Sequence, residues 1–247
     1  MFPKALRLPY ETPSLSCRCL TSIAYEKNLY LVAKRQGLTT IPTTWGGYDK
    51  FPLRAKFFHL TGQPIVAMSG KFHTSWGEFG GYKHADALRY EAASMVAYGV
   101  ACNFGDQLHP LGRMELDTYR NVGQAFQYVE QIEEYGIGGV PASNLGLWRT
   151  GSEADDEGTA RMLLETQTDF CVVDPDAPLA QYEVIVLTGA DGLSEAHAAR
   201  LNEYVRGGGR LLVLGESALD TNGSAFALDV GATYLGPGRY DVDYTSL

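Results

Sequence analysis

Apolar and polar positions follow two periodicities along most of the chain. Short runs of consecutive apolar residues, as at 183–187 and 210–214, are typical of strands that are buried on both faces. Between such runs, apolar residues recur every three or four positions, which is the spacing of an amphipathic helix. Continuous apolar strands that alternate with helices predict parallel β-sheet covered by helices. We therefore expect an α/β protein.

The pattern becomes regular from residue 38 onward. Expected strands lie at 38–42, 64–68, 100–104, 145–148, 170–173, 183–187 and 210–214, and expected helices at 51–61, 85–98, 117–134, 157–168 and 194–207. Asp117 and Ser194 are the expected N-cap residues of their helices, and Gly99 lies where a helix commonly ends. Prolines interrupt residues 1–35, where no element is predicted.

The rhythm of strands and helices is interrupted after Gly136, where glycine, proline and serine gather at 138–143. We therefore expect two domains, at 1–140 and 141–247. A complete (β/α)8 barrel takes about 250 residues, so the first domain has room for only about three of its βα units. We expect a partial barrel there, and a parallel-sheet domain that is cut short at its C-terminus in 141–247.

Charge and cysteine content narrow the class of protein. The 247 residues include 20 Lys and Arg against 29 Asp and Glu, a net charge of −9, which disfavours nucleic acid and anionic membrane as partners. No apolar run reaches the ~20 residues of a membrane span, and we expect no signal peptide because the first residues lack a continuous apolar stretch. The 4 cysteines are too scattered for a disulfide framework or a zinc site. We expect a cytoplasmic protein with reduced thiols and no metal or cofactor.

Polar and aromatic residues gather in the loops 45–48, 71–81 and 105–110, each of which follows an expected strand. Loops at the carboxyl ends of parallel strands are where α/β folds build active sites. Carboxylates supply acid, base or nucleophile in glycoside cleavage, and aromatic rings stack on the apolar faces of sugars. The candidate catalytic residues are Glu78 and Asp106, and the candidate sugar-binding residues are Trp45, Tyr48, Lys71, His73, Trp76 and His109.

Each candidate also has a structural alternative. Glu78 could cap a turn, and Asp106 could accept hydrogen bonds from backbone amides of its own loop. His109 could hold its loop, and Trp76 could be a packing residue. The case for a sugar site depends on the clustering of these residues on consecutive loops.

The sequence of these loops resembles a known family. The strings at 45–52, 71–80 and 105–113 are similar to bacterial multidomain glycoside hydrolases of the alpha-L-fucosidase and alpha-amylase-like kind. Members of that family have a (β/α)8 barrel followed by a beta-galactosidase trimerisation domain. The resemblance implies that 38–136 correspond to the late barrel strands. It also implies an exo-acting enzyme for an alpha-L-fucoside or a beta-galactoside, with carbohydrate as the substrate.

The second half resembles the trimerisation domain itself, through the strings at 182–187 and 204–217. That domain is flavodoxin-like, similar in fold to class I glutamine amidotransferases. An amidotransferase needs a cysteine nucleophile at a glycine-flanked turn after such a strand. Here Gly215 and Glu216 precede Ser217, which lacks a G-x-S-x-G frame, so we interpret Ser217 as part of a structural turn.

Two functions therefore remain open from the sequence. The early barrel strands, which carry a nucleophile in enzymes of this kind, have no counterpart in this chain. The chain is then either an incomplete glycoside hydrolase or a non-catalytic oligomerisation and assembly module derived from one. In both cases we expect self-association, either as trimers through 143–247 or as aggregates through the open edge of the barrel.

Overall fold

The computed structural model describes residues 38–40, 48–62, 64–74, 76–107, 109–136, 138–150, 152–189 and 192–238. These residues form two compact units. The first unit contains 38–40 and 64–139, and the second contains 48–62 and 140–238. Both units are mixed α/β structures built on parallel sheets, as the sequence predicts.

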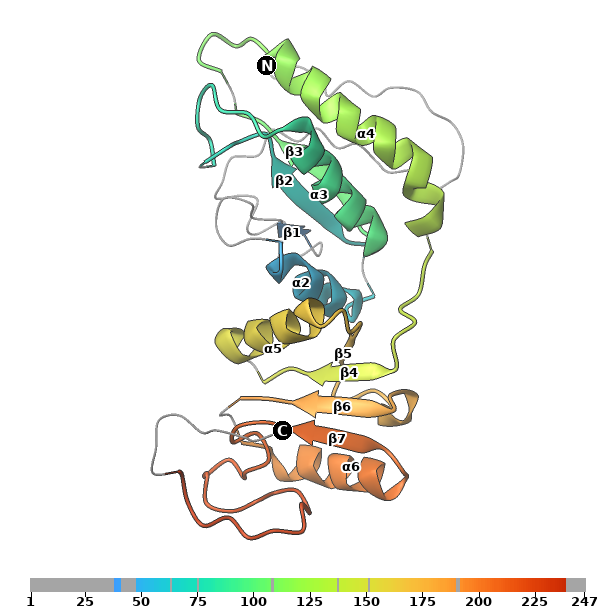
Figure 1. The fold of residues 1–247 in the computed structure, drawn as a ribbon, viewed down its shortest axis with the longest axis vertical. Coiled ribbons are helices and arrows are strands. Elements are labelled where there is room, and N and C mark those ends of the chain that lie inside the picture. Colours follow the sequence, from blue (N-terminus) through green and yellow to red (C-terminus); the bar gives the residue numbers. More distant parts are fainter. Residues whose placement is uncertain are drawn as a thin grey trace, which may run out of the picture. The chain divides into compact units, whose positions relative to one another are not determined.

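The first unit is a 3-stranded parallel sheet with the strand order β1 (Leu38–Thr40), β2 (Val66–Gly70), β3 (Ala101–Gly105). Helices α3 (Ala85–Ala97) and α4 (Leu116–Gly136) follow β2 and β3 and lie beside one another (Figure 1). The register pairs Gly70 with Gly105, so β2 and β3 end level with one another. The loops after the two strands therefore leave from the same edge of the sheet.

The two faces of this sheet differ. Cys102 places its sulfur 3.6 Å from the carbonyl oxygen of Ala92 in α3, and the ring of Phe104 meets that of Phe126 in α4. These alternate positions therefore face the helices, because successive side chains of a strand point to opposite faces. The positions between them form the other face; they are Met68, Gly70, Asn103 and Gly105.

Helix α2 (Lys50–His59) lies in the second unit, although it precedes β2 and β3 in the chain. Its Leu53 packs in a cluster with Leu147, Leu163 and Phe170. Ion pairs add to this contact; they are Lys50–Glu157 at 2.7 Å, Arg54–Glu153 at 3.2 Å and Lys56–Asp169 at 2.8 Å. Apolar fit and opposite charge together explain why α2 packs in the second unit and not on the first sheet.

The second unit is a 4-stranded parallel sheet with the order β5-β4-β6-β7. The strands are β4 (Leu145–Trp148), β5 (Cys171–Val173), β6 (Val184–Leu187) and β7 (Arg210–Val213), and the helices besides α2 are α5 (Glu153–Glu165), α6 (Glu195–Arg206) and the short η1 (Leu179–Gln181). In β4, Leu147 belongs to the core with α2 and α5, whereas Trp148 belongs to the core with α6. Figure 1 shows α5 and α6 beside this sheet. The central strands are thus buried on both faces, as predicted.

Strand β7 does not follow that prediction. Leu211 and Val213 pack against the core that contains α6, but Leu212 is 44% exposed and Leu214 is 39% exposed. The expectation of burial on both faces was wrong here because β7 is the last strand of the sheet order and α6 covers one of its faces.

Helix ends were predicted with mixed success. Ser194 is the N-cap of α6, its hydroxyl accepting from the His197 amide at 3.2 Å, and Gly99 has the left-handed φ of +66° just beyond α3. Asp117, in contrast, lies within α4 and not at its N-cap. Helix α5 begins at Glu153 after the N-cap Ser152, earlier than expected. No helix in the described part of the chain is long and apolar enough to cross a membrane.

The packing of α2 gives a stability prediction. Leu53 is 5% exposed, whereas Leu60 at the end of the same helix is 41% exposed. Leu53→Ala should lower the free energy of unfolding by about 2–4 kcal/mol through loss of burial and a residual cavity, and Leu60→Ala by less than about 0.5 kcal/mol. Urea titration followed by circular dichroism measures both. Equal effects of the two variants would contradict the packing described for α2.

Candidate functional site

The loops after β2 and β3 meet at one edge of the first sheet, which we call the carboxyl edge. The Lys71 amide donates to the Gly105 carbonyl at 3.1 Å, which extends the ladder beyond the strands. The loops also touch through side chains, since the Tyr82 hydroxyl donates to Glu115 at 2.6 Å. Two of the three polar loops predicted to share an edge therefore do so.

Trp76 lies over the ends of both strands. Atoms of its six-membered ring fall within 3 Å of where a Cβ would stand at Gly70 or at Gly105. The ring of the buried Phe72 meets the indole edge-to-face, with centroids 4.8 Å apart. Trp76 nevertheless remains 36% exposed, so part of its surface faces solvent at the carboxyl edge.

Glu78 closes the loop that contains it. Its carboxylate accepts hydrogen bonds from the amide of His73, from the amide of Thr74 at 2.6 Å and from the Thr74 hydroxyl. The Thr74 hydroxyl is the largest of the causes that hold the pKa of Glu78 below its usual value. Glu78 thus caps a turn, as its structural alternative predicted. A catalytic role for Glu78 stays a prediction.

Lys71 is fully buried on the helix side of the carboxyl edge. Its ammonium lies 3.8 Å from a carboxylate oxygen of Glu115 and 4.7 Å from the centroid of the Tyr82 ring. The hydrogen bond to Glu115 raises the pKa of Tyr82. Lys71 therefore connects the loops after β2 and β3 on the helix side of the sheet. Sequence reasoning missed Tyr82 and Glu115, because nothing in their local pattern indicates a buried cation between them.

A second buried lysine lies close by. The Lys83 ammonium donates to the Ser69 hydroxyl at 3.0 Å and to both oxygens of the buried Glu91 at 3.1 Å, and Ser69 donates to Glu91. Burial lowers the pKa of Lys83, and the Glu91 charge opposes that change. This cluster connects the end of β2, the loop before α3 and α3 itself. Removing one partner of such a pair leaves an uncompensated buried charge.

Asp106 and His109 bond mainly to their own loop. Asp106 accepts from the Gln107 amide at 2.7 Å, and its charge adds to the burial that raises the pKa of Tyr119. His109 accepts from the Leu111 amide at 3.1 Å. These contacts fit the structural alternatives and leave any catalytic or sugar-binding role untested.

The remaining candidates are Tyr48, Trp45 and His73. Tyr48 lies in the second unit, and Trp45 lies outside the described residues. His73 is exposed and contributes its amide to the Glu78 turn.

Polar atoms near the carboxyl edge are buried without a hydrogen-bond partner in the described structure. They are Nζ of Lys71, Oδ1 of Asn103 and both side-chain amide atoms of Gln107. Such atoms are uncommon in folded proteins and can accept or donate hydrogen bonds to a ligand or to further protein. Sequence reasoning did not select Asn103, because a single polar residue within an apolar strand carries no recognisable signal. In the described part of the chain, no three His, Cys, Asp or Glu side chains converge as a metal site requires.

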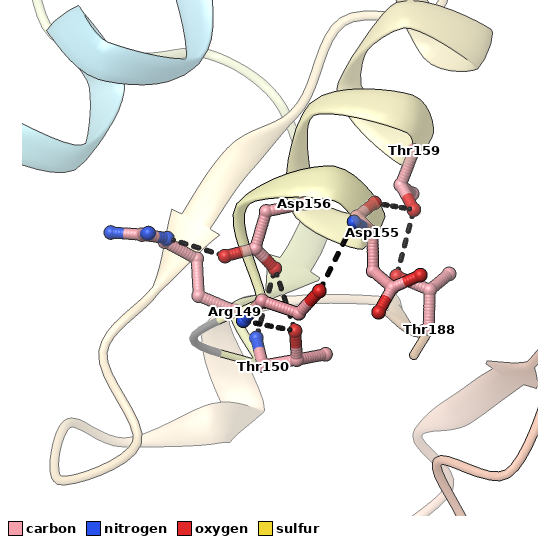
Figure 2. Close-up of polar contacts among 7 residues, drawn as sticks. Arg149, Thr150, Asp155, Asp156, Thr159 and Thr188 are labelled. Carbon is pink, nitrogen blue, oxygen red and sulfur yellow. Dashed lines mark hydrogen bonds and ion pairs between the residues drawn. The ribbon is translucent and has the colours of Figure 1, made fainter. Parts of the chain in front are cut away.

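The second sheet has its own polar cluster, at the carboxyl ends of β4 and β6 (Figure 2). The sheet order changes direction between these strands, and ligands commonly bind at such a point. Here, however, the buried Asp156 carboxylate accepts from Arg149 Nε and from the Thr150 amide, both at 2.9 Å. Thr159 bonds to Thr188 at 2.7 Å. The polar groups satisfy one another, and the acidic first turn of α5 opposes an anion there.

A hollow of about 670 Å³ lies at the amino ends of β6 and β7, between Arg200, Tyr204 and Arg210. Active sites of α/β folds lie at the opposite end of the strands.

Ser217 is buried and donates to the Leu214 carbonyl at 2.8 Å, in keeping with its interpretation as a structural turn. The carboxyl edge of the first sheet remains the best candidate site.

Solved structures resemble this chain over most of its length. Alpha-L-fucosidase isoenzyme 2 from Paenibacillus thiaminolyticus is 35% identical, with a TM-score of 0.74 over 82% of this chain and 33% of that chain. This chain is glycoside hydrolase-like. A beta-galactosidase from Bacillus circulans sp. alkalophilus (12% identity, TM-score 0.60, 78% of this chain and 34% of that one) shows likeness of fold alone.

The GH42 beta-galactosidase Gan42B likewise resembles this chain in fold, with 14% identity and a TM-score of 0.57 over 80% of this chain and 34% of that one. The chain spans about a third of the length of each of these enzymes. No protein-family model matches the chain, and no curated protein matches it in sequence.

The Glu78 turn gives a pH prediction. Because its folded pKa lies below the ordinary 4.5, ionised Glu78 stabilises the loop above about that pH, and this contribution is lost as the pH falls through the lower folded value. The amides of His73 and Thr74 should therefore titrate below pH 4.5 in NMR spectra. At neutral pH, Glu78→Gln should make both amides exchange faster, whereas Glu134→Gln in α4 should not. Unchanged exchange in Glu78→Gln would refute the turn.

Proposed function

We propose that this chain is part of a glycoside hydrolase and that the carboxyl edge of its first unit contributes to sugar binding and cleavage. The observation that carries the proposal is the 35% identity to an alpha-L-fucosidase over 82% of the chain. The loops with Trp76 and Asp106 lie at the edge where barrel enzymes place their sites. An alpha-L-fucoside or a beta-galactoside is the proposed substrate, without a cofactor.

The proposal extends to the architecture. The first unit would be the late sector of a (β/α)8 barrel, and its level parallel strands followed by helices support this. The second unit would be a flavodoxin-like domain of the trimerisation type, supported by its strand order, in which β4 lies between β5 and β6. Its sealed polar cluster supports an assembly role more than ligand binding.

Between the two candidate carboxylates, Asp106 is the better proposed catalyst. Glu78 holds three hydrogen bonds of its own turn, and a proton on Glu78 would break that turn. Asp106 accepts one backbone hydrogen bond from its neighbour, directly after the last paired residue of β3. We therefore propose that Asp106 contacts the substrate and that Glu78 shapes the loop that contains Trp76.

An activity assay tests this proposal. The purified chain should cleave 4-nitrophenyl alpha-L-fucoside or beta-D-galactoside, and Asp106→Asn should lower kcat/KM by about 100-fold or more. Asp117→Asn, an exposed control in α4, should leave kcat/KM unchanged. Cleavage that survives in both Asp106→Asn and Glu78→Gln would refute the assignment of these carboxylates. No cleavage by the wild-type chain would favour the second candidate function.

That second candidate is a non-catalytic assembly module. The observation that favours it is the exposed apolar face of β7, with Leu212 and Leu214, at the end of the second sheet. Unpaired strand edges and uncovered apolar faces tend to find other chains. Self-association as a trimer through 143–247 is the proposed form.

Light scattering of the full chain tests the assembly role. The wild-type chain at micromolar concentration should have a mass above the 27.0 kDa of one chain. The double variant Leu212→Lys and Leu214→Lys should shift it toward that mass, because charges on the β7 face would have to be buried. Val205→Lys, at an equally exposed apolar position on α6, serves as the control. A monomeric wild-type chain would contradict the proposal.

A further inference from the structure

The indole ring of Trp76 occupies a space that is open because two neighbouring residues, Gly70 and Gly105, have no side chain. We call this space the seat of Trp76. A Cβ at Gly105 would stand 2.5 Å from Cη2 and 2.9 Å from Cζ2 of Trp76. A Cβ at Gly70 would stand 2.7 Å from Cδ2 of Phe72 and 2.8 Å from Cζ3 of Trp76. These separations are shorter than van der Waals contact. The six-membered ring of the indole can therefore occupy this position only while both residues are glycine.

The backbone itself does not require glycine at either position. Gly70 and Gly105 lie at the ends of β2 and β3, and neither has a positive φ, so other residues could adopt their conformation. Glycine weakens a strand and often marks the close approach of another group. Because the register places the two residues side by side, they form one continuous surface without side chains. The approaching group is the Trp76 ring at Gly105, and the rings of Phe72 and Trp76 together at Gly70.

The indole of Trp76 is held by its neighbours and is also partly exposed to solvent. Phe72 supports it edge-to-face from a buried position, while Trp76 itself keeps 36% of its surface exposed. A sugar ring with an apolar C–H face needs a rigid aromatic surface, since ordering a mobile one would reduce affinity. Beneath the seat, on the same face of the sheet, the buried Oδ1 of Asn103 has no partner in the described structure.

We propose that Gly70 and Gly105 are positioning residues that fix Trp76 as the stacking platform for the apolar face of a sugar ring. This inference rests on the proposed function, because the platform matters only if the carboxyl edge binds carbohydrate. It assigns a role to two residues that touch no substrate and act through the indole. If Trp76 were only a packing residue, displacing it would alter stability without altering sugar affinity.

The test uses the full chain with Gly105→Ala, and Gly123→Ala as the matched control. A Cβ at Gly123, within α4, meets nothing within 4 Å. The indole N–H signal of Trp76 is followed by NMR, assigned with Trp76→Phe, and L-fucose and D-galactose are titrated as probes. Gly105→Ala should shift this signal in the free protein and weaken binding by about three- to tenfold. Gly123→Ala should change neither.

The outcomes test the seat of Trp76 and its role as a sugar platform separately. An unmoved Trp76 signal in Gly105→Ala overturns the seat, and a moved signal with unchanged sugar affinity overturns the platform. If the signal moves but the wild-type chain binds neither sugar, the proposed function and the platform fail together, whereas the seat is supported. Should Gly105→Ala not fold, the double variant Gly105→Ala and Trp76→Leu provides the check. It must fold if the clash is with the indole, and its failure to fold would overturn the seat.

Discussion

The parallel pairing of β2 with β3 is the constraint on which the carboxyl edge depends. Because the strands run in the same direction and end level at Gly70 and Gly105, the chain leaves both of them at one edge. The Lys71 amide then prolongs the ladder by one hydrogen bond. The contact of Tyr82 with Glu115 is possible only because of this register. A shift by one residue would turn Asn103 toward the helices and Phe104 away from them.

The charged side chains at this edge mainly form ion pairs that connect the loops to neighbouring segments. Lys71 and Lys83 are both buried, and each lies against a carboxylate that belongs to another segment. Burial lowers the pKa of Lys83, and the Glu91 carboxylate opposes that change and so favours the charged ammonium. The carboxylates that remain for chemistry are correspondingly few.

The sequence predicted elements and edges better than partners. Consecutive apolar residues located β6 and β4, and Ser194 signalled the start of α6 through its capping hydroxyl. The amphipathic pattern of α2 identified its apolar side but not the surface that covers it, because that surface lies about a hundred residues later in the chain. Glu91 shows the same limit, since nothing near it in a helix indicates that Lys83 and Ser69 will bury its charge.

The membership of α2 in the second unit bears on how such chains can recombine. A gene fusion that carried only the codons after the linker would leave α2 behind, because it is encoded upstream of β2 and β3. The transplanted sheet would present Leu147 and Phe170 to water, and Glu157 would lose its two cationic partners. A cut at the glycine-rich linker therefore separates the second sheet from a helix of its own unit.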